Sequence, residues 1–215
     1  MKLEEIGSLD WDKGGGLLPA VVQDAMTGTV LMVGYMNREA LRTTLSGGLA
    51  TFYSRSRQAL WTKGETSGNR LEVDSVSVDC DADTLLVLAR PTGPVCHNGT
   101  ATCFPRAEAT RAGELAFLAR LESVVADRIA RQPEGSYTAE LFSQGPSRIA
   151  QKIGEEGVEV ALAAVGPDDA KVVGESADLL YHLILLLRQR GLALADVAAE
   201  LELRHAGRKS SKAGE

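Results

Sequence analysis

Residues 91–129, PTGPVCHNGTATCFPRAEATRAGELAFLARLESVVADRI, are the stretch in which the character of the sequence changes. Its first part is predicted to be an irregular loop, because three prolines fall among glycines and threonines, and proline fits neither a helix interior nor a central strand. From about Gly113 the apolar residues recur at spacings of three and four, the period of an amphipathic helix. We therefore place a domain boundary near residues 107–113.

The chain before this boundary, residues 1–110, is predicted to be an α+β domain that is mostly β. Its apolar segments are short, and one of them alternates with polar residues as a half-buried strand does. A short helix is expected between Asn37, a suitable N-cap, and the pair Gly47 and Gly48. The expected strands cover residues 29–35, 50–54, 71–79 and 84–89.

The chain after the boundary, residues 111–206, is predicted to be an all-α domain. The helical period that begins near Gly113 is followed by three further helical stretches, at about 147–165, 168–189 and 195–204. Residues 207–215 are small, polar and basic, so we expect a disordered tail there.

The composition is that of a soluble globular protein. Of the 215 residues, 44% are hydrophobic and 24% are charged, and the net charge of −6 disfavours a general nucleic-acid binder. The longest apolar stretch is far shorter than the roughly 20 residues that a membrane span requires, and the N-terminus lacks the apolar core of a signal peptide. We expect a cytoplasmic protein that has no nucleic-acid or membrane partner and keeps its three cysteines reduced, free or metal-bound.

An acidic motif, residues 79–83, is expected to form the end of the alternating strand that begins at residue 71. Because side chains alternate along a strand, Asp79, Asp81 and Asp83 would share one face, and Cys80 would lie on the other. Three like charges at one edge favour a cation among them, and oxygen ligands favour Mg²⁺. The alternative is a solvated acidic turn without a metal ion.

The cysteines and a neighbouring histidine form a second candidate site. Cys96 and Cys103 lie in the proline-rich loop, with His97 beside the first, and Cys80 lies on the expected strand. Three cysteine ligands would hold zinc and leave a fourth position for water, as in catalytic zinc sites. His97 is a candidate proton shuttle, or else it supports the metal site. The alternative is that each cysteine is a buried structural thiol.

A phosphate-binding region is expected in residues 54–69. Small residues, hydroxyls and cations gather there, and such loops bring backbone N–H groups and positive charge to a phosphate. Arg55, Lys63 and Ser67 are the candidate ligands, and Lys63 is also a candidate catalytic residue. Taken alone this signal is weak, because loops rich in Gly, Ser and Thr are common.

These motifs together resemble phosphoribosyl-AMP cyclohydrolase of histidine biosynthesis over about residues 15–107. The resemblance rests on SRSR at 54–57 with LWTKGETSGN at 60–69, on DCDAD at 79–83, and on GPVCH at 93–97 with CF at 103–104. Asn98 departs from the family, which usually has threonine there. The resemblance implies zinc on the three cysteines, Mg²⁺ on the three aspartates, and a site built between two subunits. It also implies attack by zinc-activated water on carbon 6 of the N1-alkylated adenine, which opens the ring.

Carboxylates also gather on two of the expected helices. Residues three apart on a helix are neighbours, so Glu156 pairs with Glu159, and Glu175 pairs with Asp178. If the two helices pack against each other, four carboxylates converge as in Mg²⁺ sites that hydrolyse phosphate anhydrides, with Glu155 a further possible ligand. Glu156 and Asp178 are the candidate catalytic residues. The alternative is a solvated acidic face.

Two cations and one histidine lie near these carboxylates. Arg148 and Lys152, four residues apart, either bind a triphosphate or pair with Glu155 and Glu156. His182 lies in an apolar helical stretch, so we expect a hydrogen-bonded core residue rather than a metal ligand.

This half resembles phosphoribosyl-ATP pyrophosphohydrolase over about residues 114–205. The resemblance rests on GSYTAELF at 135–142, RIAQKIGEEGVE at 148–159 and ESADLLYHL at 175–183. It implies Mg²⁺-dependent cleavage of phosphoribosyl-ATP between its α and β phosphates, giving phosphoribosyl-AMP and pyrophosphate.

The two resemblances together predict a bifunctional hydrolase of histidine biosynthesis that assembles as a homodimer. Its substrates would be phosphoribosyl-ATP and phosphoribosyl-AMP, with one zinc ion per chain and Mg²⁺ as cofactors. Two alternatives remain. The helical half could hydrolyse another nucleoside triphosphate, or the helices could be a dimerisation module beside a structural zinc site.

Overall fold

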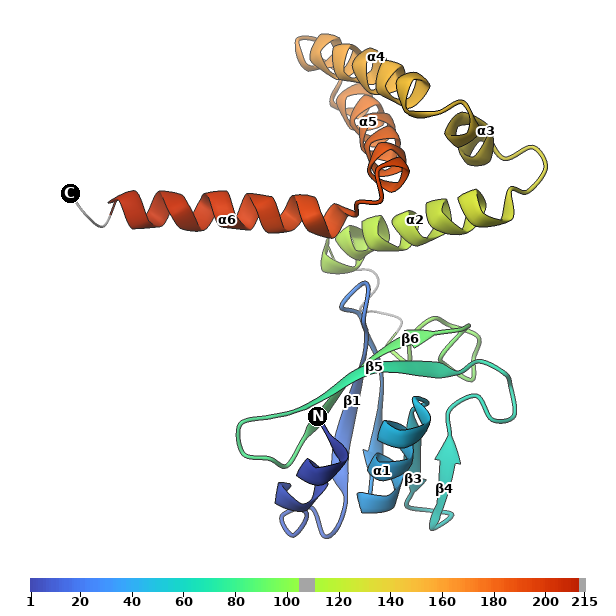
Figure 1. Cartoon of the computed structure of the whole chain (residues 1–215), viewed down its shortest axis with the longest axis vertical. Coiled ribbons are helices and arrows are strands. Elements are labelled where there is room, and N and C mark those ends of the chain that lie inside the picture. Colours follow the sequence, from blue (N-terminus) through green and yellow to red (C-terminus); the bar gives the residue numbers. More distant parts are fainter. Residues whose placement is uncertain (105–110, 213–215) are drawn as a thin grey trace. The chain divides into compact units, whose positions relative to one another are not determined.

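The computed structural model describes residues 1–104 and 111–212 (Figure 1). The chain divides into two compact units, Met1–Leu118 and Ala119–Glu215. The division falls inside helix α2 (Arg111–Arg131), C-terminal to the boundary expected near residues 107–113, part of which lies outside the described residues.

The first unit is built on a four-stranded mixed sheet in the order β2-β1-β6-β5. Its strands are β1 (Leu18–Asp24), β2 (Val30–Met36), β5 (Leu71–Val78) and β6 (Leu85–Pro91). β1 runs parallel to β6, while β1 with β2 and β5 with β6 are antiparallel pairs. A two-stranded sheet, β3 (Thr51–Ser54) and β4 (Ala59–Thr62), a 3₁₀ helix η1 (Leu3–Ser8) and helix α1 (Arg38–Gly47) complete the unit. Sheets and a helix agree with the α+β expectation.

The core of this unit lies between the four-stranded sheet and α1. Along β1 every second side chain is buried, as the period of two requires: Leu18, Ala20 and Val22. The Asn37 side chain accepts a hydrogen bond from the Ala40 N–H, which confirms the expected N-cap, and the helix ends at Gly48 with a left-handed φ of 69°.

Two strands of the first unit were not predicted as separate elements. β1 carries Pro19, and proline is uncommon in a strand that pairs on both sides, so the sequence gives little local signal there. β4 is short and pairs only with β3, where Trp61 lies 5.0 Å from Phe52 between ring centroids.

The acidic motif requires a correction. β5 ends at Val78, and residues 79–83 form the turn that leads into β6, so the strand alternation proposed for Asp79, Cys80 and Asp81 does not continue through them. Ala82 has a φ of 62°, which a strand would not allow.

The second unit is helical, as expected. It contains part of α2 together with α3 (Tyr137–Ser143), α4 (Pro146–Ala164), α5 (Asp169–Gln189) and α6 (Leu194–Lys212). Asp168 caps α5 by accepting hydrogen bonds from the Ala170 and Lys171 N–H groups, and Pro146 begins α4. α4 and α5 pack along each other (Figure 1). The buried apolar cluster is small, with five members: Val125, Leu141, Ile149, Ile184 and Leu185.

The helices differ from expectation in two places. α3 was not predicted, because seven residues are too few to show a helical period. α6 continues to Lys212, so residues 207–212 are helical where a disordered tail was expected, and residues 213–215 lie outside the described part. Within the described residues, we find no helix of the length and apolar character that a bilayer span demands.

Candidate active sites

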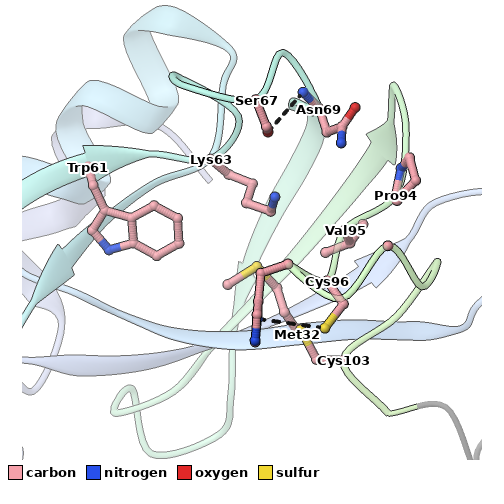
Figure 2. A pocket seen from close by; sticks show the side chains of 11 residues that line it. Met32, Trp61, Lys63, Ser67, Asn69, Pro94, Val95, Cys96 and Cys103 are labelled. Carbon is pink, nitrogen blue, oxygen red and sulfur yellow. Dashed lines mark hydrogen bonds between the residues drawn. The ribbon is translucent and has the colours of Figure 1, made fainter.

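The first unit contains a cavity of about 530 Å³ lined by both loop cysteines (Figure 2). The loop that carries them is fixed to β2, because the Cys103 N–H donates to the Leu31 carbonyl at 2.8 Å and the Thr102 hydroxyl donates to the Val30 carbonyl at 2.6 Å. Cys96, Cys103, His97, Lys63 and Ser67 all line this cavity, together with Asn69 and Trp61. Five of the residues predicted from separate motifs are therefore brought together.

The two cavity thiols differ in their electrostatic surroundings. The pKa of Cys96 is lowered, mainly by the backbone N–H of Asn98, and next by the Thr100 side chain. Burial raises the pKa of Cys103, and the neighbouring Cys96 adds to that rise. Asn98, the residue that departs from the family pattern, makes this contact with its backbone. The His97 Nδ1 lies 3.8 Å from the Cys96 sulfur.

Two predicted members of this site lie elsewhere. Cys80 is exposed in the turn between β5 and β6 and does not line the cavity, so one chain does not bring its three cysteines together. Arg55 does not line the cavity either, because its guanidinium lies 4.0 Å above the Tyr35 ring centroid in a cation–π contact.

The three aspartates of the turn do converge. Each of Asp79, Asp81 and Asp83 offers an oxygen, and these atoms lie within 4.8 Å of one another. The turn is held by Asp79, whose Oδ1 accepts from the N–H groups of Asp83 and Thr84 at 3.1 and 3.0 Å. The sequence therefore identified the cluster correctly, although a turn rather than a strand face gathers it.

Lys13, which no sequence pattern singles out, pairs with two of these three carboxylates. The Lys13 ammonium pairs with Asp83 and lies 2.5 Å from Asp81. These contacts lower the pKa of both carboxyls and raise the pKa of Lys13. The Asp10 N–H donates to the Ala82 carbonyl at 2.8 Å, which holds the lysine-bearing segment against the turn. Lys13 is 68 positions from Asp81, so no local pattern could reveal the contact.

The second unit has a cavity of about 510 Å³ beside α4 and α5. Its lining combines acidic, basic and aromatic side chains: Arg128, Tyr137, Lys152, Glu156, Asp178, Tyr181 and His182. Glu156, Glu175 and Asp178 each offer an oxygen within 4.8 Å of the others, as expected from their spacing on two paired helices. Glu156 is buried, whereas Asp178 is exposed to the cavity.

Lys152 pairs with two carboxylates of α4. Its ammonium lies 2.7 Å from Glu156 and 2.9 Å from Glu155, and the hydrogen bond to Lys152 is the main reason that the pKa of each carboxyl is lowered. Glu159 is outside the converging trio, and its pKa is raised, first by a hydrogen bond with Glu156 and then by repulsion from that carboxylate. Arg148 is exposed and does not line the cavity.

His182 is a buried, hydrogen-bonded core residue, as expected. Its Nδ1 lies 2.8 Å from the Asp178 carbonyl oxygen, and its Nε2 lies 3.1 Å from the Tyr137 hydroxyl. The sequence analysis missed Tyr137 and Arg128 as lining residues. Tyr137 lies within the GSYTAELF motif, which was a usable signal, whereas Arg128 lies on α2, distant in sequence from the acidic helices.

Comparison with known proteins assigns each half of the chain to an enzyme family. The phosphoribosyl-AMP cyclohydrolase family model matches residues 32–105, and the phosphoribosyl-ATP pyrophosphohydrolase model matches residues 118–205. A histidine biosynthesis bifunctional protein HisIE from Xanthomonas axonopodis pv. citri is 59% identical over 202 residues, covering 94% of this chain and 95% of that protein. The chain belongs to the HisIE family of bifunctional histidine-biosynthesis enzymes.

Relatives of the same name occur in other bacteria. The Escherichia coli K12 protein is 54% identical over 197 residues, covering 92% of this chain and 95% of its own length. The Vibrio cholerae protein is 52% identical over 197 residues, covering 92% of this chain and 93% of its own length. The helical half of this chain thus hydrolyses phosphoribosyl-ATP to phosphoribosyl-AMP and pyrophosphate, and the first half opens the adenine ring of phosphoribosyl-AMP.

Proposed function

We propose that phosphoribosyl-ATP is hydrolysed at the cavity beside α4 and α5, with Mg²⁺ held by Glu156, Glu175 and Asp178. The supporting observation is that these three carboxylates each offer an oxygen within 4.8 Å of the others, and that Glu156 and Asp178 line the cavity. A carboxylate set of this kind suits a hard cation that prefers oxygen ligands. Bound there, Mg²⁺ would neutralise phosphate charge in the transition state. Glu159, one turn from Glu156, is the fourth proposed ligand.

The protein's own residues have distinct roles in this proposal. Lys152, which lines the cavity, exchanges part of its contact with Glu156 for the substrate phosphates. Glu156 and Asp178 are the catalytic carboxylates, and Glu155 remains the outward partner of Lys152 rather than a metal ligand. Arg148 is kept as a peripheral phosphate contact, because it adds positive charge near Glu155.

For the cyclohydrolase site we propose a zinc ion on Cys96 and Cys103 of one chain and Cys80 of a second copy. The two cavity thiols suit a soft thiolate-binding metal, and the lowered pKa of Cys96 favours its thiolate form. Two protein ligands are too few for a stable zinc site, and Cys80 lies outside the cavity of its own chain. Zinc would supply an activated water at neutral pH.

The other cavity residues would bind and protonate the substrate. Lys63 extends into the cavity from the end of β4, and Ser67 lies on the same rim, so these two would hold the phosphate (Figure 2). His97 lines the cavity beside Cys96 and would carry the proton during ring opening. Arg55, stacked on Tyr35, would contact the phosphate only by leaving that ring.

The acidic turn is proposed to bind Mg²⁺ through Asp79, Asp81 and Asp83. The group fits a cation, because a positive charge, the Lys13 ammonium, already lies against two of the three carboxylates. A bound Mg²⁺ would displace that ammonium from Asp81 and Asp83.

A homodimer is supported by the outer face of the four-stranded sheet. Val33, Val21 and Leu86 are adjacent across β2, β1 and β6, and Val33 and Leu86 are 46% and 37% exposed. An apolar row on a sheet face favours burial against another surface. The small buried cluster of the helical unit also favours association. A cytoplasmic location, as for other small-molecule biosynthesis, belongs to the same proposal.

The Cys103→Ser variant tests the zinc site. A serine hydroxyl replaces thiolate poorly, so we expect loss of zinc on dialysis and loss of ring opening. The helical unit has its own buried cluster and its own carboxylates, so pyrophosphate release should persist and phosphoribosyl-AMP should accumulate. Metal analysis, circular dichroism and product chromatography measure these three outcomes. Retained zinc with full ring opening would remove Cys103 from the site.

A further inference from the structure

A tyrosine and a histidine form a hydrogen-bonded pair at the wall of the second cavity. Tyr137 is the first residue of α3, where the Ser136 side chain caps the helix by accepting from the Ala139 N–H. Its ring is 51% exposed, whereas His182 on α5 is only 4% exposed. The Tyr137 hydroxyl lies 3.1 Å from Nε2 of His182. The tyrosine and the nearly buried histidine therefore line the cavity side by side.

The surroundings of His182 fix the direction of this hydrogen bond. Nδ1 lies 2.8 Å from the backbone carbonyl oxygen of Asp178, and a carbonyl can only accept, so Nδ1 carries the proton. In the neutral imidazole Nε2 then has a lone pair and no hydrogen. With His182 neutral, the Tyr137 O–H donates to Nε2, and the tyrosine oxygen presents only lone pairs to the cavity.

The two cations of the cavity have the opposite character. Lys152 and Arg128 can only donate, so they suit phosphate oxygens. The second tyrosine of the cavity, Tyr181, has its hydroxyl paired with the Thr138 hydroxyl at 2.7 Å. Tyr137 is thus an uncharged position at which a phosphate oxygen, itself an acceptor, would be disfavoured and a donor would be held.

We propose that the Tyr137 oxygen accepts a hydrogen bond from an N–H or O–H donor on the nucleoside part of the substrate, and that His182 is a positioning residue that imposes this polarity. The donor is the exocyclic nitrogen of the base or a ribose hydroxyl. This inference rests on the proposed function of the second cavity as the pyrophosphohydrolase site. It divides that cavity into a cationic phosphate side and an acceptor side for the nucleoside.

The test uses AMP and three analogues as inhibitors of pyrophosphate release by the full chain at pH 8. This readout reports only the helical unit. 2′-Deoxy-AMP and 3′-deoxy-AMP each lack one ribose donor, and IMP replaces the exocyclic amino group by a carbonyl. Each is measured against the parent protein, Tyr137→Phe, and the matched control Tyr181→Phe, which removes a phenol hydroxyl from the same cavity.

We expect Tyr137→Phe to weaken AMP inhibition about fivefold to tenfold, as the loss of one hydrogen bond would. In the parent protein, one analogue should inhibit more weakly than AMP by a similar factor. In Tyr137→Phe, inhibition by that analogue should not weaken further. If that analogue is IMP, the donor is on the base; if it is a deoxy compound, the donor is on the ribose. Tyr181→Phe should change the inhibition constants of AMP and its three analogues by the same factor.

Equal weakening of all four inhibitors by Tyr137→Phe, or no weakening, would overturn the proposal, since simple packing of the ring predicts such results. Absence of inhibition by AMP would also overturn it, because the nucleoside would then lie elsewhere. A failure of the proposed function would be distinguished from a failure of this inference by Asp178→Asn, which would release pyrophosphate normally only if the proposed site is wrong. His182→Asn should abolish the difference in inhibition between AMP and the weaker analogue, although the tyrosine is still present. If His182→Asn does not fold, the Tyr137→Phe measurements still decide the proposal.

Discussion

Heterodimers of Cys80→Ser and Cys96→Ser test whether the cyclohydrolase site is shared between chains. One chain places Cys96 and Cys103 in the cavity and Cys80 in an exposed turn outside it. In a twofold dimer each site would take Cys80 from one chain and the loop cysteines from the other. Each variant alone should therefore lose zinc and ring opening.

The heterodimer should recover activity in a defined proportion. One of its two sites contains both substitutions. The other site takes an intact Cys80 from the Cys96→Ser chain and both intact loop cysteines from the Cys80→Ser chain. Co-expression with two different tags and tandem purification yields this species. We expect about half of the parent's ring opening and about half of its zinc per dimer, by the symmetry of a twofold interface. Pyrophosphate release, measured on the same sample, provides the normalisation.

A matched control distinguishes shared sites from general stabilisation. A heterodimer of Cys96→Ser with Cys103→Ser has one lesion in the loop of each chain, so both of its sites are incomplete and it should stay inactive. The reasoning is refuted if the first heterodimer remains inactive although both tags are present. It is equally refuted if Cys80→Ser alone keeps zinc and full ring opening.

Three further predictions concern the carboxylate clusters. Asp178→Asn should reduce pyrophosphate release at least a hundredfold while ring opening of supplied phosphoribosyl-AMP continues, as a lost metal ligand would require; normal release would exclude Asp178 from the site. Asp81→Asn should raise the Mg²⁺ concentration needed for ring opening and leave the zinc content unchanged. Lys13→Met should lower that Mg²⁺ concentration, because the competing ammonium is gone. Mn²⁺ binding, followed by electron paramagnetic resonance, checks both variants, and unchanged binding in both would contradict the assignment. Glu159 has a raised pKa, so its ionisation lowers the stability of the fold as pH rises through that pKa. Glu159→Gln should therefore raise the Tm of the metal-free protein at pH 7 but not at pH 4. Equal Tm values for the variant and the parent protein at pH 7 would refute the repulsion between Glu159 and Glu156.

The carboxylates of the helical site could be predicted from the sequence because their geometry is local. A spacing of three residues on a helix fixes which side chains are neighbours, so the pair Glu175 and Asp178 needed only the packing of α4 on α5 to meet Glu156. The same reasoning failed for residues 79–83, because strand alternation holds only while the backbone stays extended, and the chain turns after Val78.

The residues that the sequence did not reveal are those delivered by tertiary contacts. Lys13 reaches Asp81 because a backbone hydrogen bond from Asp10 to Ala82 holds its segment against the turn. Arg128 enters the second cavity from α2, far from the acidic motifs in sequence. Neither contact follows from periodicity or composition, since both depend on how distant elements pack.

The two sites differ in how much of the fold each one requires. The converging carboxylates of the helical site come from α4 and α5, a pair joined by a short connection, so this carboxylate set is complete when those two helices pack. The cyclohydrolase site takes Lys63 from the end of β4, two thiols from the loop after β6 and, in our proposal, Cys80 from a second copy. Conditions that weaken association should therefore suppress ring opening before they suppress pyrophosphate release. Phosphoribosyl-AMP, the product of the first step and the substrate of the second, would then accumulate.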